Sequence, residues 1–486
     1  MNGLQLIFGD SSLRHQKFLL IAASTAALTV SQSAMAAGFA VSAQSAYGMG
    51  NAYAGNAAVA SDASTVLTNP AGIFELDKPV LGVNVAITST GVDFADKGSR
   101  TSPLFNADPV SVSGDGSTSL SSANPSPGLY YARKLNDQWA LGFGLNVPFA
   151  TESSYEDNWV GRYHAVETEV TAIDINPTIA FRINDKVSIG GGISIQRATG
   201  RLTNKLDSGA TCALIYFQNG VPPAACAAEP PNGPALVPND ATRDSTVELD
   251  GDSTEITFNI GALFKPKEGT KIGVAYRHGS QHNLKGNTKF ILDPGLAALI
   301  RPPGEDPVAP GPRFLDNSAS ALSADLPATL DLSIAQMVHE KVELLGTLKW
   351  TQWTSFDVLT TTFDNPEQND TALPFAWEDT VTASAGFNYE VNNKLTMRAG
   401  FLYDQSPVPN PRARSPRGAA NDRYWYSVGG TYSFSSKISI NFAATHIQID
   451  QSAIDNTGET TGSPTLRGTY DFDVNLIAFQ FNWHFI

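Results

Sequence analysis

The sequence has few charged residues, few cysteines and no long apolar run. Only 16% of its 486 residues are charged, against roughly 25% in soluble domains. No apolar run approaches the roughly 20 residues of a membrane-spanning helix, which excludes a bundle of such helices. Glycine, by contrast, is abundant, with 41 residues. Low charge without spanning helices indicates β structure, in which alternation dilutes the apolar residues along each strand.

The scarcity of cysteine and of basic clusters limits the chemistry further. Cys212 and Cys226 bracket the segment "ALIYFQNGVPPAA", and the sequence has no CxxC motif and no Cys/His cluster. In an exported chain this spacing favours a disulfide that staples a loop over a metal or catalytic pair. The formal net charge of -15 and the lack of any lysine- or arginine-dense block argue against nucleic acid as a partner. We therefore expect no metal and no cofactor.

The first 36 residues are typical of a secretory signal peptide. A basic stretch at 14–17 precedes the apolar run "FLLIAASTAALTV" at 18–30, and "AMA" at 34–36 has the small residues that a signal peptidase requires. We predict cleavage after Ala36. A retained anchor helix is the alternative, but the apolar run is too short to span a membrane comfortably.

Many segments after residue 79 alternate between large apolar and small or polar residues. In "QWALGFGLNVPF" the odd positions from Trp139 to Phe149 are large and apolar, and in "KVELLGTLKW" charges such as Glu343 and Lys349 occupy the second face. We count about fourteen to sixteen such segments of about ten residues, the length of a tilted strand that crosses a bilayer. A soluble sandwich or propeller is the alternative, but its strands average about five or six residues. The pattern favours a membrane barrel with a polar lumen.

The connections between these segments fall into two classes. Short turns are expected at 183–186, 338–341, 391–394 and 434–437, and long loops at about 207–251 and 293–326. Short turns on one side and long loops on the other are typical of outer-membrane barrels, whose long loops face outside. Within the second long loop, "PGLAALI" at 294–300 is either a short apolar helix over the barrel mouth or part of a disordered Pro-rich loop.

Several motifs, taken together and in order, resemble the FadL-type long-chain fatty acid transporters. They are "AGF" at 37–39, "GMGNAYAG" at 48–55, "NPA" at 69–71, "NWVGRYHAV" at 158–166, "KWTQWTSF" at 349–356 and "NDRYWYSVGGTYSF" at 421–434. The resemblance covers nearly the whole mature length. It implies an all-β fold, a transmembrane antiparallel β-barrel of about 14 strands, plugged by an N-terminal hatch. Residues 37–78 would form the hatch and residues 79–486 the barrel.

The resemblance also implies passive uptake of long-chain fatty acids. In the family, a ligand lodges among the extracellular loops, moves to a lumenal pocket and leaves sideways through a wall opening at the kinked third strand. Asn69, Pro70 and Ala71 match the hatch motif associated with gating, and Phe39 matches the aromatic residue at the plugged end.

Pro148 provides a local physical reason for such an opening. Proline can donate no ladder hydrogen bond, so strand pairing must break or bulge near it. We expect the lateral opening at Asn146, Pro148 and Phe149. The alternative is a proline that ends its strand at the rim, and Ala150 stands where relatives often carry glycine after the Pro-Phe pair.

A carboxylate head group requires a cation or hydrogen-bond donors. Lys349 and Arg398 lie on the predicted inward parity of their strands and are our candidates. The alternative is a lumenal ion-pair lattice with Glu343, Glu390 and Asp404.

Three other functions compete with fatty acid uptake. The same mechanism would serve aromatic or alkane hydrocarbons, a general porin would pass polar solutes, and a barrel lipase would need converging Ser, His and Asn or Asp at the rim. The seven histidines show no such signature, so we expect a transporter and not an enzyme. We expect it as a monomer in the outer membrane of a Gram-negative bacterium. A hydrophobic small molecule, outer-membrane lipid and lipopolysaccharide are its expected partners.

Overall fold

The computed structural model describes residues 40–41, 43–102, 108–227, 235–300, 313–419, 421–458 and 463–485, all within one unit, Gln32–Ile486. The predicted signal peptide, its predicted cleavage site and Phe39 lie outside the described residues. Among the described residues, no helix is both long enough and apolar enough to span a membrane.

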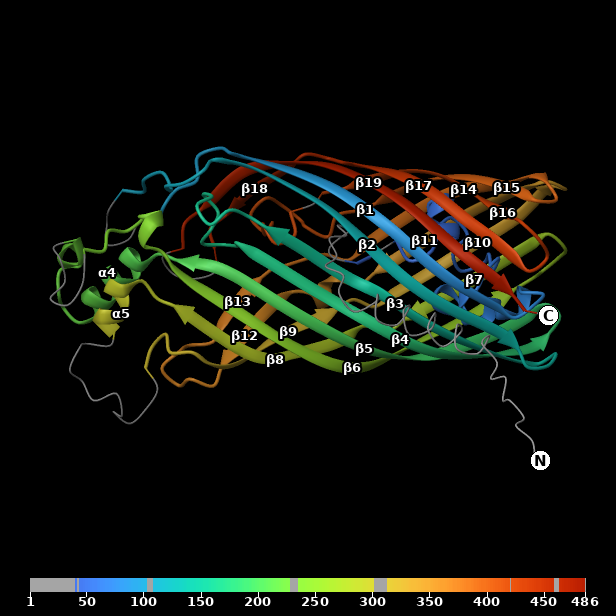
Figure 1. The fold of residues 1–486 in the computed structure, drawn as a ribbon, viewed down its shortest axis with the longest axis horizontal. Helices are drawn as coiled ribbons and strands as arrows, with labels where there is room; N and C mark the ends of the chain where they lie inside the picture. Colours follow the sequence, from blue (N-terminus) through green and yellow to red (C-terminus); the bar gives the residue numbers. More distant parts are fainter. Residues whose placement is uncertain are drawn as a thin grey trace, which may run out of the picture. The chain divides into compact units, whose positions relative to one another are not determined.

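Nineteen strands of the described residues form one antiparallel sheet that closes on itself (Figure 1). They are β1 (Val80–Asp96), β2 (Ser117–Lys134), β3 (Trp139–Ser154), β4 (Glu167–Asn184), β5 (Val187–Leu206), β6 (Ser245–Phe264), β7 (Thr270–Arg277), β8 (Ser280–Ile291), β9 (Ser318–Leu326), β10 (Thr329–His339), β11 (Val342–Thr351), β12 (Val358–Phe363), β13 (Thr371–Pro374), β14 (Thr380–Asn392), β15 (Leu395–Asp404), β16 (Arg423–Ser433), β17 (Ile438–Ile449), β18 (Ser452–Asn456) and β19 (Leu466–His484).

The nineteen strands make fourteen crossings of the barrel wall. Short interruptions divide five crossings into two strands each, namely β7/β8, β9/β10, β11/β12, β13/β14 and β17/β18. β1 pairs with β19 on one side and with β2 on the other, which closes the ring. The predicted closed antiparallel barrel of about 14 strands is confirmed. All four predicted short turns also lie between consecutive strands.

Two details of the sequence prediction were wrong. β5 and β6 each contain 20 residues, twice the predicted strand length. The long loops are correspondingly shorter, because 245–251 belongs to β6 and 318–326 is β9. Beyond the lipid-facing band the outward side chains are polar or small, so the outward apolar residues that identify a membrane strand are missing while the ladder continues.

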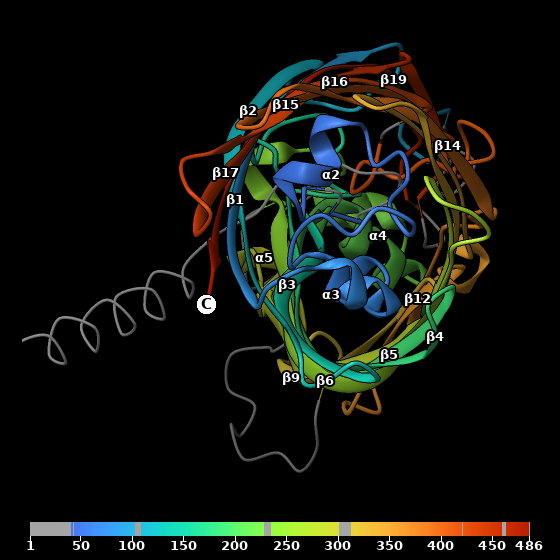
Figure 2. The same ribbon diagram turned by 90° about the vertical axis from the view of Figure 1, so that its right-hand side faces the viewer.

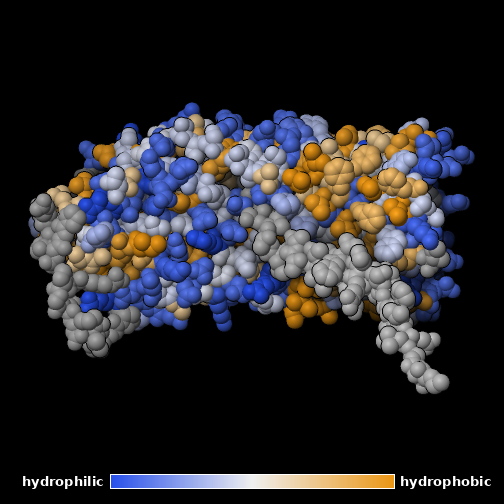
Figure 3. All heavy atoms as spheres, viewed as in Figure 1, coloured by the Kyte–Doolittle hydropathy of each residue, from blue (hydrophilic) through white to orange (hydrophobic). Residues whose placement is uncertain are grey.

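The outer surface of the wall bears the large apolar residues. In β3, Trp139, Leu141 and Phe143 are exposed, whereas Ala140 is fully buried. The same outward pattern includes Ile193 in β5. Figure 3 shows that such residues gather toward the end of the barrel that carries the short turns, while the end with the long loops is more polar. The apolar part forms the lipid-facing band expected of a membrane barrel.

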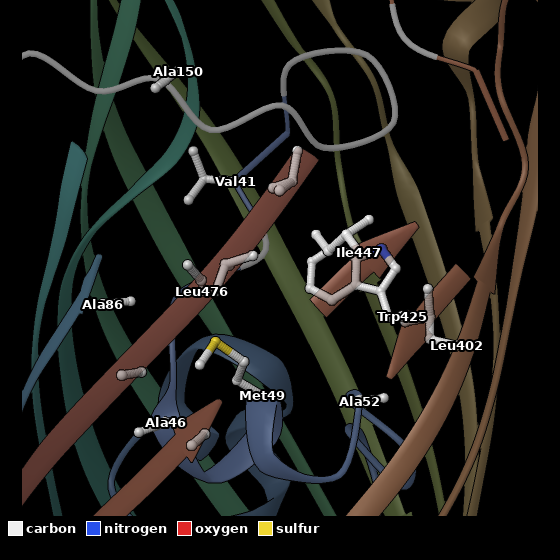
Figure 4. Packing of buried hydrophobic residues seen from close by; sticks show 14 of the residues in the cluster. Val41, Ala46, Met49, Ala52, Ala86, Ala150, Leu402, Trp425, Ile447 and Leu476 are labelled. Carbon is white, nitrogen blue, oxygen red and sulfur yellow. The ribbon is translucent and has the colours of Figure 1, made fainter. Parts of the chain in front are cut away.

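Residues 43–78, here called the inner segment, lie inside the barrel. They include α2 (Ala46–Gly50), α3 (Thr65–Thr68) and the 3-10 helix η1 (Pro70–Glu75). Figure 2 shows α2 and α3 enclosed by the ring of strands. In Figure 4, Met49 of α2 lies near wall residues that include Trp425 and Leu476, all members of one buried cluster.

Small wall residues allow the inner segment to approach closely. A Cβ atom on Gly429 of β16 would lie 2.8 Å from the Gly50 Cα, so only glycine fits there. Polar wall side chains also accept backbone hydrogen bonds from the segment, as Asn84 Oδ1 does from the Ala46 amide at 2.9 Å and Ser333 Oγ from the Ala57 amide at 3.0 Å. Its alanine-, glycine- and serine-rich composition therefore suits a segment that is packed against a polar lumen wall.

Most of the remaining short helices lie at the end with the long loops. They are α4 (Ser208–Gln218), η3 (Pro223–Ala227), η4 (Ala241–Arg243) and α5 (Pro294–Ile300), and a further 3-10 helix, η5 (Trp353–Ser355), joins β11 to β12. α5 confirms the helical interpretation of "PGLAALI", and Figure 1 shows it beside α4 over the barrel mouth.

Candidate functional site

A cavity of about 170 Å³, here called the inner cavity, lies between the inner segment and the wall. From the N-terminal part it is lined by Ala40, Val41, Gln44, Ser45, Tyr53, Asn56, Ser64, Leu67 and Thr68. From the wall it is lined by Pro148, Phe149, Asn259, Ile260, Ala275, Tyr276, Arg277, Pro327, Thr329, Asp331, Thr347, Lys349, Thr351, Trp353, Thr382, Ser384, Leu402, Asp404 and Trp425. Aromatic side chains and charged groups therefore border the same space.

Two cations border the inner cavity. The Arg277 Nη1 atom lies 2.9 Å from the Asp174 Oδ2 atom and is therefore neutralised. Lys349 faces Asp331 across the β10–β11 ladder and its charge interacts with that carboxylate, but no direct ion-pair contact joins Lys349 to any residue in the described part of the chain. A charged amine without a salt-bridge partner beside apolar walls suits an amphipathic anion.

Arg398, the second predicted head-group cation, does not reach the inner cavity. Its guanidinium lies 3.8 Å from the centroid of the Tyr47 ring, and the residue is only 2% exposed beneath α2. The strand register places Arg398 level with Glu343, which is about 20 Å from Lys349 along β11 at the usual rise per residue. The structure therefore does not bring Lys349 and Arg398 together. The prediction that both side chains point into the barrel was correct. However, the alternation along a strand does not show how far along the barrel axis a residue lies.

Asn69, Pro70 and Ala71 connect the inner segment to the wall. The Asn69 side chain donates from Nδ2 to the carbonyl of Ala57 at 2.7 Å and to that of Ala262 in β6 at 3.0 Å. Ser188 of β5 donates to the Ala71 carbonyl at 2.9 Å. These bonds hold η1 against β5 and β6, the two strands that follow β4 in the wall.

The β3 strand changes register at Pro148. Asn146 pairs with Asp174 of β4 and Phe149 with Ala172, so β3 contains one residue more than β4 over this stretch, which is a β-bulge. Among the described residues, the β2–β3 ladder runs only from Leu129–Leu145 to the short-turn end.

The chain before the inner segment runs beside this bulge. The Val41 amide donates to the Pro148 carbonyl at 2.8 Å, and Ala40 forms an antiparallel bridge with Phe149. Ala40, Val41, Pro148 and Phe149 also line the inner cavity. The bulge, the N-terminal chain and the cavity are thus one continuous region.

A second cavity of about 1230 Å³, here called the outer cavity, lies at the long-loop end. Its apolar lining includes Leu206 of β5, Ile215 of α4, Phe290 of β8 and Leu299 of α5. One buried apolar cluster borders both cavities. Leu249, Leu322, Leu359 and Leu373 of that cluster line the outer cavity, and Phe149 and Trp353 line the inner one.

A fully buried ion pair supports the loops around the outer cavity. Arg162 Nε lies 2.6 Å from Asp244 Oδ2, and the two side chains are 0% and 2% exposed. The Tyr163 hydroxyl donates to the other Asp244 oxygen at 3.0 Å, and Arg162 also donates to Ser113. Three loops, which follow β1, β3 and β5, are joined at this one guanidinium.

A second ion pair joins the two long loops. Arg243 of η4 donates two hydrogen bonds of 2.7 Å to Asp293, just before α5. Burial alone would raise the pKa of Asp293, but the bonds from Arg243 and from the Gly295 amide outweigh it and hold the pKa below its ordinary value. The carboxylate therefore stays charged at neutral pH, and the pair loses its stabilising effect only in strong acid.

Cys212 of α4 and Cys226 of η3 form a disulfide, with the Cα atoms 6.1 Å apart. Both lie in a buried apolar cluster with Leu236 and Leu296, beside the outer cavity.

We expect a Cys212→Ser/Cys226→Ser variant to keep its folded barrel but to lose the order of the loop after β5. A disulfide that closes a loop of about 15 residues stabilises by about 3 kcal/mol, and here that energy acts only on the loop. Limited proteolysis should cleave the loop faster, while heat-modifiable migration in gels stays unchanged. Reduction of the wild-type protein is the control and should have the same effect. Equal cleavage rates would show that the disulfide does not order the loop.

Within the described ranges, no group of three or more His, Cys, Asp or Glu side chains is placed to hold a metal ion.

The closed barrel, its apolar outer band and its internal cavities define a β-barrel protein of the outer membrane. A family model described as outer membrane protein transport protein (OMPP1/FadL/TodX) matches residues 27–485, and the chain belongs to this family. It is therefore a transporter of hydrophobic compounds in the outer membrane of a Gram-negative bacterium, and not an enzyme.

Individual relatives agree with this assignment. The chain is 28% identical to Outer membrane protein P1 of Haemophilus influenzae, over 97% of this chain and 100% of that protein. It is 26% identical to the Long-chain fatty acid transport protein of Escherichia coli (strain K12), over 93% and 97%. Its fold is similar to the crystal structure of a Pseudomonas aeruginosa FadL homologue, with a TM-score of 0.77 and 25% identity over 93% and 100%. The Pseudomonas putida toluene transporter TodX shares the fold, with a TM-score of 0.63 and 18% identity over 90% and 98%.

Sequence reasoning missed Arg277 and Asp174, which the structure places at the inner cavity and opposite the bulge. Asp174 is fully buried on the inward face of β4, within a stretch whose outward residues are Ile173 and Ile175. The sequence did contain a signal for this pair, namely a carboxylate in the middle of a lipid-facing stretch. A buried charge requires a partner, so Asp174 indicates a cation nearby.

Proposed function

We propose that this protein takes up long-chain fatty acids by passive transport. The observation that carries the proposal is Lys349, a cation without an ion-pair partner among the described residues, at a cavity with aromatic walls. A carboxylate would bind the amine, and the alkyl chain would bind beside Phe149 and Trp353. A hydrocarbon would offer the amine no direct ion-pair partner, which makes a hydrocarbon the second choice.

The route begins at the outer cavity and ends at the bulge in β3. A fatty acid would enter among the long loops, which face outside in barrels of this class. It would follow the apolar cluster shared by both cavities, which includes Leu249 and Leu373, so its chain stays away from water. Each methylene kept from water is worth about 0.8 kcal/mol.

The exit would be sideways, through the wall between β2 and β3. The bulge at Asn146, Pro148 and Phe149 ends the regular β2–β3 ladder, and Ala40 and Val41 cover the edge of β3 at this place. Movement of the inner segment, held at Asn69, Pro70 and Ala71, would uncover the opening and act as the hatch. Outer-membrane lipid and lipopolysaccharide would surround the barrel. One chain closes the ring and needs no partner strand to complete it, and we propose a monomer.

We expect a Lys349→Met variant to bind palmitate about tenfold or more weakly, and hexadecanol almost as well as the wild type. A hydrogen bond to a charged group contributes about 1.5–3 kcal/mol, and only the acid makes one with Lys349. The measurement is the Kd of purified protein for each ligand, with mass spectrometry of lipid retained after mild purification.

Lys394→Met, in the short turn between β14 and β15, is the matched control and should bind both ligands normally. Equal losses for acid and alcohol would remove Lys349 as the head-group residue. Retained hydrocarbon without fatty acid would favour the second choice.

A further inference from the structure

Arg277 contacts three parts of the protein that transport would have to coordinate. It ends β7, and its side chain lines the inner cavity. Its Nη1 atom donates to Asp174 Oδ2 and to Ser194 Oγ, both at 2.9 Å. Its Nη2 atom donates to the carbonyl of Leu67, in α3 of the inner segment, at 3.4 Å. One guanidinium thus joins the cavity, the wall and the inner segment.

The partner carboxylate is placed at the bulge. Asp174 pairs with Asn146 in the β3–β4 ladder, and Asn146 is the last residue before the register shift. Asp174 is fully buried, and Arg277 is its ion-pair partner among the described residues. Loss of that partner without a replacement donor would leave an uncompensated buried charge next to Asn146, which is strongly unfavourable.

The polar groups around this pair are incompletely hydrogen-bonded. In the described part of the chain, both side-chain atoms of Asn146, the Asp174 Oδ1 atom and the Asn176 Oδ1 atom are buried without a partner. Buried polar atoms normally have partners, so a group of orphans marks a network that can rearrange. A new arrangement could satisfy atoms that this one leaves unsatisfied.

We propose that Arg277 is a positioning residue that links ligand occupancy to movement of the inner segment. The inference rests on the proposed function. A ligand carboxylate in the inner cavity competes with Asp174 for the guanidinium. As Arg277 turns to the ligand, it releases the Leu67 carbonyl, and the unpaired Nδ2 donor of Asn146 beside the bulge replaces the guanidinium as the partner of Asp174. The ligand then stabilises the state in which Arg277 has released the inner segment, because Arg277 can bind the ligand only in that state.

The test follows the position of the N-terminal chain with a single cysteine. An Ala40→Cys reporter is placed in a Cys212→Ser/Cys226→Ser background, and its thiol labelling rate is measured with palmitate, with hexadecanol and with no ligand. Because coupling energies between sites typically correspond to about 5-fold or more, palmitate should accelerate labelling by about that factor, and hexadecanol should not.

Two substitutions of the pair should remove this response. In Arg277→Met and in the isosteric Asp174→Asn, labelling should already be fast without ligand, and palmitate should add less than about 2-fold. Arg467→Met breaks an exposed ion pair with Asp455 and should respond like the wild type. Asp174→Asn removes the charge without changing side-chain volume, so it serves if Arg277→Met does not fold.

Three results would overturn the link. They are a full palmitate response in both pair variants, an equal response to hexadecanol, or no response in the wild-type background. Retained fatty acid in mass spectra of the same samples shows whether the proposed function survives. Bound fatty acid without a labelling response would contradict only the role of Arg277.

Discussion

Oxidation of an Ala40→Cys/Phe149→Cys variant is expected to stop fatty acid uptake. These two residues form an antiparallel bridge, and directly opposed residues in such ladders have Cα atoms about 4.5–5.5 Å apart, within reach of a disulfide. The bond would fix the N-terminal chain to the edge of β3 and keep the proposed opening covered. Uptake of labelled palmitate by intact cells should fall by about tenfold or more. The bond would prevent exchange between the closed state and an open state that differs from it by only a few kcal/mol.

The experiment distinguishes the effect of the disulfide from the effect of the two substitutions themselves. The variant is built in the Cys212→Ser/Cys226→Ser background, so that reductant acts on the new bond alone. Reduction should restore uptake to the level of the Phe149→Cys single variant, and each single cysteine substitution should leave uptake insensitive to oxidant. Normal uptake with the bond formed would mean that the ligand does not leave at the bulge.

The second large effect is expected from Arg162→Met. Removal of one partner from a buried ion pair typically costs about 3–5 kcal/mol, and here the uncompensated charge would be Asp244. The loops after β1, β3 and β5 would lose their common donor, while the barrel below them should persist. Hydrogen exchange at 155–166 and 238–245 should increase by about a hundredfold or more.

A double variant serves as the control for this effect. Replacement of both partners, as in Arg162→Met/Asp244→Leu, should restore much of the protection, because apolar pairs often substitute for buried ion pairs at little cost. If both variants lose protection equally, packing and not charge pairing holds the loops. If neither loses it, the ion pair does not order the loops around the outer cavity.

Much of the fold could be predicted because the membrane imposes its own pattern. In β3 and β5 the outward residues face lipid and must be apolar, while the inward ones are small or polar. This alternation survives in the sequence and predicts the barrel. Outside the lipid band the outward residues are polar or small, so 245–251 and 318–326 lack the outward apolar pattern and were wrongly assigned to loops.

The site was only partly predictable, because a strand pattern shows the face of a residue and not its level. Pro148 was identified because proline lacks an amide hydrogen, which is a local property of the residue. Lys349 and Arg398 were both placed inside, but register across β11, β14 and β15 separates them. The Arg277–Asp174 pair needed the alignment of β4 with β7 through two intervening strands, which no single segment reveals.

The most direct test is uptake of labelled palmitate by cells that lack their own long-chain fatty acid transporter and express this protein. Lys349 at an aromatic cavity and the bulge at Pro148 predict that uptake is restored, and that oxidised Ala40→Cys/Phe149→Cys abolishes it. Toluene uptake should change little. Correctly folded protein in the outer membrane that restores toluene uptake but not palmitate uptake would contradict the fatty acid assignment.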